Sequence, residues 1–101
     1  MSANETVKKF SLGRIVATPG ALQALHAAGQ SADEFLARHV VGDWGDLDDE
    51  DCQANEAALI DGSRILSAYK TRKGERIWVI TEAVNDVGLR YCTTILLPSD
   101  Y

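Results

Sequence analysis

The sequence lacks the features of a membrane, secreted or disulfide-bonded protein. No apolar run in its 101 residues approaches the length that crosses a bilayer, and the polar start, residues 1–9, has no apolar core of a signal peptide. The two cysteines, Cys52 and Cys92, form no paired motif, so we expect free thiols in a reducing compartment. These absences predict a cytoplasmic protein with no membrane contact.

Positive charge is also scarce. Ten lysines and arginines face fifteen aspartates and glutamates, which gives a formal net charge of −5. Because binding driven by phosphate neutralisation needs clustered Lys and Arg, we expect direct nucleic-acid binding to be absent and basic partners to be attracted instead.

Motifs for cofactors and metals are missing as well. The glycines are not spaced as a phosphate loop, and the acids between residues 43 and 51 do not follow the order of a calcium loop. His26, His39 and Cys52 have no zinc spacing. We therefore expect no cofactor and assign no metal ligand.

The length predicts one domain, residues 10–101, after a flexible tail of residues 1–9. In its first half, one short strand is followed by helices. Residues 10–17 alternate as a short strand, and Thr18-Pro19 should begin a helix that buries Leu22 and Leu25 and ends near Ala28.

Two more helices are expected before the chain changes character. A capping box of Ser31 and Glu34 should begin the second helix, whose buried side includes His39 and which Gly42 stops. The third helix begins with the acids from Asp48, has the apolar side Cys52, Asn55, Ala58 and Leu59, and ends at Gly62.

The second half is rich in β-branched and aromatic residues. Residues 64–71, 76–82 and 90–97, joined by short turns, predict a three-stranded antiparallel meander. The expected fold is α+β, with two to three helices packed on one face of this sheet and the N-terminal strand as a candidate fourth at an edge. Ile77, Val79 and Ile95 should face the helices, whereas Trp78 and Ile80 should be exposed unless another segment covers them.

The segment between the second and third helices carries the strongest local charge. Six of the nine residues from 43 to 51 are carboxylates, and Trp44 lies between Gly42 and Gly45. The structural interpretation is that the indole plugs the end of the core. The functional hypothesis is a partner-binding segment made of Asp43, Trp44, Asp46, Asp48, Asp49, Glu50 and Asp51.

Basic residues gather farther along the chain, so charge is separated. Arg64, Lys70, Arg72, Lys73 and Arg76 lie in the first two strands of the meander and their hairpin. This arrangement favours either an internal match between the third helix and the sheet or a dipolar protein-binding surface. Whether the hairpin at residues 70–76 touches RNA stays open.

An enzymatic alternative uses the same residues. Helices followed by an antiparallel sheet with basic strands look like the small toxin ribonucleases, and His39 with Lys70 or Arg72 contains suitable side chains. The structural alternative, in which these are ordinary core and strand-surface residues, is favoured.

Five motifs, taken in order, resemble one family. They are Phe-Leu-Ala-Arg-His (35–39), Gly-Asp-Trp-Gly (42–45), Gly-Ser-Arg-Ile-Leu-Ser-Ala-Tyr (62–69), Ile-Trp-Val-Ile-Thr-Glu-Ala (77–83) and Thr-Thr-Ile-Leu-Leu-Pro-Ser-Asp-Tyr (93–101). The chain is similar from Phe10 onward to a widespread family of bacterial proteins of this size from plasmids, prophages and integrative elements. Members carry the label plasmid-related protein or type I restriction endonuclease subunit M.

The second label does not fit, because a methyltransferase needs a large nucleotide-binding domain and an Asn-Pro-Pro catalytic loop. The resemblance implies a mobile-element protein that acts on host machinery and transfers no catalytic residues. We therefore expect a non-enzymatic acidic protein, monomer or homodimer, that binds a host protein or nucleoprotein complex and inhibits a defence nuclease, of the anti-restriction or anti-CRISPR type. The alternative is the small ribonuclease.

Overall fold

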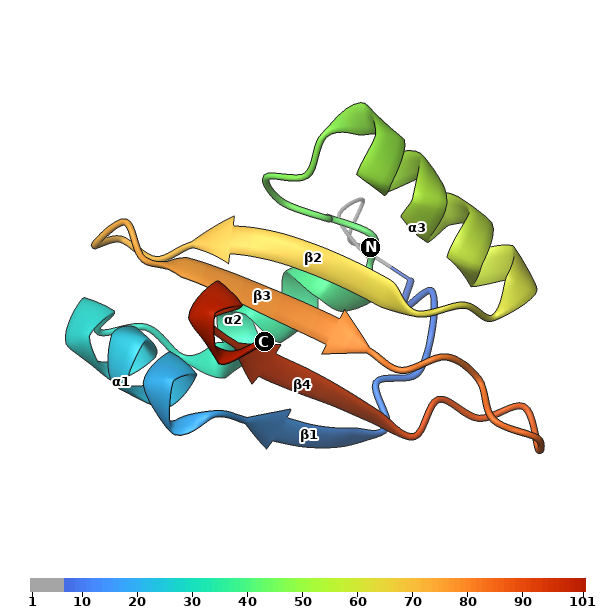
Figure 1. The fold of residues 1–101 in the computed structure, drawn as a ribbon, viewed down its shortest axis with the longest axis horizontal. Coiled ribbons are helices and arrows are strands. Elements are labelled where there is room, and N and C mark those ends of the chain that lie inside the picture. The colour runs from blue at the N-terminus through green and yellow to red at the C-terminus, as the bar shows by residue number, and fades with distance from the viewer. Residues whose placement is uncertain (1–6) are drawn as a thin grey trace, which may run out of the picture.

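The computed structural model describes residues 7–101, and Figure 1 shows their fold. A four-stranded sheet has the order β1-β4-β3-β2, so the strand that begins the chain lies beside the strand that ends it. The elements in chain order are β1 (Arg14–Ala17), α1 (Pro19–Ala28), α2 (Ala32–Val40), α3 (Asp49–Asp61), β2 (Ile65–Lys70), β3 (Arg76–Thr81), β4 (Cys92–Leu96) and the short 3-10 helix η1 (Pro98–Asp100).

The predicted α+β class and the antiparallel meander are confirmed, but the sheet is mixed. Strands β2, β3 and β4 pair antiparallel, with Ser67 opposite Val79 and Val79 opposite Ile95. Strand β1 occupies an edge, as expected, and pairs parallel with β4, with Arg14 opposite Cys92. It is also shorter than predicted, because residues 10–13 form no strand and Gly13 has a φ of 65°.

Two helices, α1 and α2, pack on one face of the sheet, which agrees with the two to three helices that the sequence predicted there. Helices α1 and α2 lie behind the sheet in Figure 1, whereas α3 runs beside the edge strand β2. The Asn55 side chain fixes this position: its amide nitrogen donates to the Leu66 carbonyl (2.6 Å), and its oxygen accepts from the Leu66 amide (3.1 Å). One helix therefore pairs with the sheet edge through a side chain.

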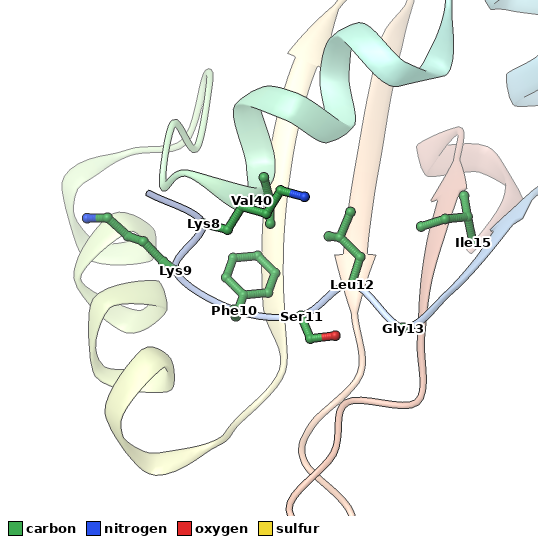
Figure 2. Close-up of a pocket in the computed structure, with 8 residues that line it drawn as sticks. All are labelled: Lys8, Lys9, Phe10, Ser11, Leu12, Gly13, Ile15 and Val40. Atoms are coloured by element: carbon green, nitrogen blue, oxygen red, sulfur yellow. The ribbon is translucent and has the colours of Figure 1, made fainter. Parts of the chain in front are cut away.

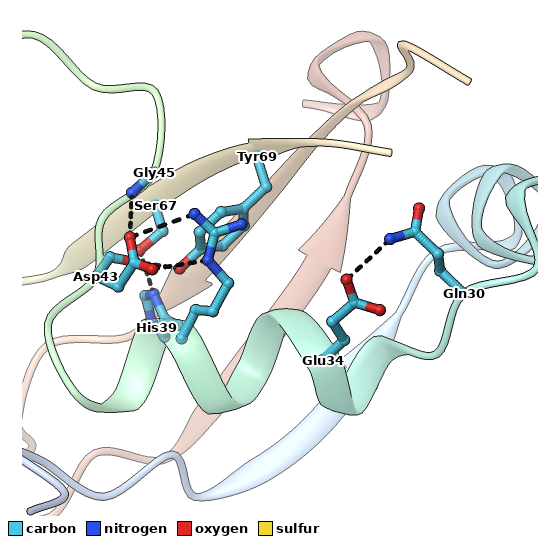
Figure 3. A network of polar contacts seen from close by, with 8 residues as sticks. Gln30, Glu34, His39, Asp43, Gly45, Ser67 and Tyr69 are labelled. Atoms are coloured by element: carbon cyan, nitrogen blue, oxygen red, sulfur yellow. Dashed lines mark hydrogen bonds and ion pairs between the residues drawn. The ribbon is translucent and has the colours of Figure 1, made fainter. Parts of the chain in front are cut away.

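Helix starts follow their caps, with one correction. The Thr18 hydroxyl accepts from the Ala21 amide, and the Asp48 carboxylate accepts from the Asp51 amide. Ser31 caps α2 by accepting from the Asp33 amide, but no reciprocal capping box forms. The Glu34 carboxylate instead accepts from the side-chain amide of Gln30 at 2.9 Å (Figure 3), so it is not available to the Ser31 amide.

The main core lies between the sheet and the first two helices. Ile77, Val79 and Ile95 are completely buried there, as predicted, together with Phe35 and Leu25. Leu22 was expected in the same stripe but is 52 % exposed, and the alanines of α1 pack on the sheet in its place. The small side chains let this helix approach the sheet closely.

The opposite face of the sheet is partly covered by the end of the chain. Ile80 is only 6 % exposed, and Trp78 packs edge-to-face on Tyr101 with ring centroids 5.7 Å apart. Asp100 holds this turn by accepting from the Thr18 hydroxyl at 2.6 Å. The surface that the sequence left open at Trp78 and Ile80 is therefore partly covered by the chain itself. No helix in residues 7–101 is both long and apolar enough to cross a bilayer.

Candidate functional site: an acidic surface at the start of α3

The acidic segment leaves α2 and turns along the outer edge of β2. The Asp46 amide donates to the Ala68 carbonyl (2.7 Å), and the Ala68 amide donates to the Trp44 carbonyl (3.1 Å). Gly45 permits this approach because its φ is 75° and any Cβ there would collide with the Ala68 carbonyl oxygen. The backbone at residues 44–46 therefore docks on the sheet and aims the acids that follow at solvent.

Trp44 anchors this segment in the interior. Its side chain is 5 % exposed and packs with Ala58 and Ile65 in a second apolar cluster. The indole nitrogen donates to the Glu56 carboxylate at 3.0 Å, and the ring stacks on Phe10 with centroids 6.3 Å apart. The side chain occupies the place that the structural interpretation gave it and offers little surface to a partner.

Asp43 is engaged with the protein's own arginine. Its carboxylate accepts from Arg38 Nε at 2.7 Å and from the Gly45 amide at 3.2 Å (Figure 3). The hydrogen bond from Arg38 holds the pKa of Asp43 below its usual value. Tyr69 donates to the Asp43 carbonyl at 2.6 Å, and its ring lies 4.5 Å beneath the Arg38 guanidinium. Asp43 thus fastens the segment to α2 and β2.

The other five carboxylates form what we call the acidic surface: Asp46, Asp48, Asp49, Glu50 and Asp51. All five side chains are exposed. In residues 7–101 the Arg38–Asp43 pair is the one ion pair, so none of these five carboxylates forms an ion pair with a described cation. Within the acidic surface, the Asp48 carboxylate accepts a hydrogen bond from the Asp51 amide at 2.8 Å, which caps α3 and orders its first turn.

Of the two alternatives for the separated charges, the internal match between α3 and the sheet has no ion pair to support it in the described residues. None of the basic residues of β2 and β3 forms an ion pair with α3. Lys70 and Arg76 pair with each other across the strands, and both are exposed. Tyr69 faces the helices, so its neighbour Lys70 points to the opposite face. The charge distribution that remains is dipolar, with acid beside one sheet edge and cations on the sheet face away from α1 and α2.

His39 lies in a buried polar chain that sequence analysis could not assemble. Its Nδ1 lies 2.5 Å from Ser67 Oγ, and its Nε2 lies 2.9 Å from Thr81 Oγ1. Thr81 Oγ1 lies 2.6 Å from Thr93 Oγ1, which donates to the Leu12 carbonyl at 2.7 Å. Figure 3 shows His39 and Ser67 beside the Asp43 contacts.

The carbonyl at the end of this chain fixes every proton in it. The Thr93 hydroxyl donates its hydrogen to the Leu12 carbonyl, so its oxygen must accept from the Thr81 hydroxyl. The Thr81 oxygen must then accept from His39 Nε2. The proton of His39 is therefore on Nε2, and Nδ1 accepts from Ser67. Burial lowers the pKa of His39 to about 4, with a further contribution from Arg90, so the ring is neutral at pH 7.

Arg90 is a structural clamp that no sequence motif revealed. It is 8 % exposed, and its guanidinium donates to the Ser63, Glu82 and Ala58 carbonyls at 2.7, 3.0 and 3.0 Å. These bonds join α3 to the segment just before β2 and the segment just after β3. An arginine whose donors are spent on backbone carbonyls stabilises the fold and leaves little for a ligand.

Two open clefts flank the N-terminal segment. Figure 2 shows the larger one, about 600 Å³, where Phe10 lies next to Val40, the Lys8 side chain crosses Val40 in this view, and Lys9 points away from both. The second, about 350 Å³, lies beside the end of α3 and includes Leu59, Ile60 and Leu89. The larger cleft includes Lys8 and Lys9, and the second includes Asp61 and Arg90. In residues 7–101 no three His, Cys, Asp or Glu side chains are placed to share a metal ion.

Comparison with known proteins adds no assignment. No family model matches this chain, and no curated protein or solved structure matches it at a significant level.

Proposed function

We propose that this protein acts without catalysis, by docking its acidic surface on a cationic site of another macromolecule. The observation that carries the proposal is that five clustered carboxylates are exposed and unpaired in residues 7–101. The resemblance to mobile-element proteins suggests the partner: a host defence nuclease, whose cationic site holds phosphate.

The spacing of the acids supports this choice of partner. Asp48, Asp49, Glu50 and Asp51 follow one another at the start of α3, where each residue advances about 1.5 Å along the axis. Double-stranded DNA carries one charge per about 1.7 Å of its axis. Over one helical turn, the protein therefore offers a linear charge density close to that of duplex DNA.

The rest of α3 favours a protein surface as the partner. Ile60 at its far end is 90 % exposed, and Val87 and Leu89 of the loop before β4 are exposed as well. Val84 and Leu89 line the same cleft as Ile60. Interfaces between proteins combine apolar contact with charged surroundings, and charge complementarity speeds their association. The acidic surface would steer the encounter, and the exposed aliphatic side chains near the end of α3 would add contact area.

The ribonuclease alternative has no specific observation in its favour. His39 is fully buried, and both ring nitrogens are engaged with Ser67 and Thr81. Lys70 points to the opposite face of the sheet. A general base must reach the proton that it removes, so this constellation would have to unfold locally before it could act.

The test removes the charge of the acidic surface without removing its shape. The variant Asp46→Asn, Asp48→Asn, Asp49→Asn, Asp51→Asn loses four negative charges, and asparagine at residue 48 still caps the helix. The control Asp33→Asn, Glu75→Gln, Glu82→Gln, Asp86→Asn loses four exposed carboxylates elsewhere. Both variants change the net charge from −5 to −1 (−5 + 4).

The measurement is capture from a bacterial host lysate at physiological salt, quantified by mass spectrometry. The wild type and the control variant should retain a shared cationic partner that the acidic-surface variant loses. Equal retention by all three would exclude the charge mechanism. Equal loss in both variants would assign the binding to net charge instead of this site.

A further inference from the structure

The two edges of the sheet differ in how their backbone groups are satisfied. Along β2, the outward amide and carbonyl of Leu66 pair with the Asn55 side chain, and those of Ala68 pair with residues 44–46. This edge is therefore closed to another strand. Proteins commonly cover sheet edges in this way because unpaired edges attract other chains.

Along β1 the edge is open. The Arg14 amide donates to the Tyr91 carbonyl, and the Thr18 amide donates to the Ile95 carbonyl. Backbone groups alternate in direction, so the N–H and C=O of Ile15 and Ala17 point away from β4. No hydrogen bond within residues 7–101 reaches these four groups. Figure 1 shows β1 at the margin of the sheet, with none of the described residues forming a segment beyond it.

Apolar side chains accompany these open backbone groups. Ile15 is 45 % exposed and Val16 is 43 % exposed, on opposite faces of the same strand. Pro19 follows directly after Thr18 and has no amide hydrogen, so it limits how far any added strand could pair. The edge is thus suited to a short apolar strand.

We propose that β1 pairs with β1 of a second copy of this chain, antiparallel across a two-fold axis at Val16. In this register Ile15 exchanges two hydrogen bonds with Ala17 of the second copy, and the symmetric pair adds two more. Val16 faces its own equivalent, so apolar side chains meet apolar ones. The two sheets join into one of eight strands.

Charge placement favours a second copy as the occupant. The acidic surface lies beside β2, at the opposite edge of the sheet, so two molecules that join at β1 keep their acidic surfaces far apart. This limits repulsion between two chains that each carry a net charge of −5. Both acidic surfaces remain free, so the dimer would present two copies of the site proposed above. The inference itself does not depend on that function.

The test is sedimentation velocity across the micromolar range, because so small an interface gives a concentration-dependent dimer. Val16→Lys places two ammonium groups opposite each other at the axis and should weaken association about tenfold or more. Ala17→Pro removes an outward N–H that the monomer does not use. The control Ile60→Lys adds the same charge at a side chain 90 % exposed on α3.

A wild-type dimer that Val16→Lys and Ala17→Pro dissociate and Ile60→Lys preserves would support the proposal. A wild type that stays monomeric throughout the range would overturn it, as would a dimer that survives both β1 variants or is lost in the control. Hydrogen exchange of the wild type gives an answer without any variant. The Ile15 and Ala17 amides should become protected as concentration rises, and concentration-independent exchange at both would refute the pairing.

Discussion

Acid should destabilise this protein through His39, because the ring is buried neutral within a hydrogen-bond chain. A protonated ring would need two acceptors, and its Nδ1 now accepts from Ser67. The ring also packs at 77° on Trp44 with centroids 6.0 Å apart, in surroundings that solvate charge poorly. The folded state therefore resists protonation that the unfolded chain accepts freely.

The magnitude follows from the two pKa values. The pKa of His39 is 6.5 in an unfolded chain and about 4 in the fold. Between these values the unfolded state binds more protons at His39, so the contribution of His39 to the free energy of unfolding falls as pH drops from 6.5 toward 4 and levels off below that. At about 1.4 kcal/mol per pKa unit, the loss is about 3 kcal/mol.

The assay compares the wild type with His39→Gln, which cannot titrate but keeps a donor and an acceptor. Urea unfolding at pH 7, 5.5 and 4 should be followed by circular dichroism, because indole fluorescence would respond to the ring beside Trp44. Asp43, Asp61 and Asp100 have lowered pKa values and also lose stability in acid, but they do so in both proteins.

The difference between the two proteins therefore isolates His39. Relative to His39→Gln, the wild type should lose about 3 kcal/mol of unfolding free energy between pH 7 and pH 4. A difference that stays constant with pH would refute the argument, as would a nuclear magnetic resonance titration that shows His39 protonated near pH 6.5.

The remaining predictions concern two side chains that position α3: Asn55, which binds the edge of β2, and Asp48, which caps the helix. Asn55→Ala leaves the Leu66 amide and carbonyl without partners and should lower the free energy of unfolding by about 2–3 kcal/mol in urea titrations. A loss below about 0.5 kcal/mol would mean that water replaces the Asn55 hydrogen bonds and would contradict their structural role. Asp48→Ala removes the cap of α3 and should cost about 1 kcal/mol, whereas Asp48→Asn should cost little; equal losses would show that charge, not capping, is responsible.

Local patterns in the sequence predicted the elements well. The β-branched runs located β2, β3 and β4, the predicted cap at Thr18 located α1, and the run of acids from Asp48 located α3. The glycines around Trp44 indicated that its indole is buried. These predictions succeed because each depends on neighbours within a few residues.

Contacts between segments that are distant in the sequence could not be predicted from local patterns. The parallel pairing of β1 with β4 joins the two ends of the chain, and no local pattern encodes its direction. Arg90 likewise finds its three carbonyls only in the folded chain. One signal was present: Asn55, a polar residue within the apolar side of α3, marked the helix that pairs with the sheet edge.

The central claim is that the acidic surface occupies a site that otherwise holds phosphate. Its most direct test adds short duplex DNA to the complex between the wild type and its captured partner and measures the amount of partner released. DNA should displace the protein in a concentration-dependent manner, because both would bind the same cations. A complex that holds DNA and the protein together, with no release at saturating DNA, would contradict the account.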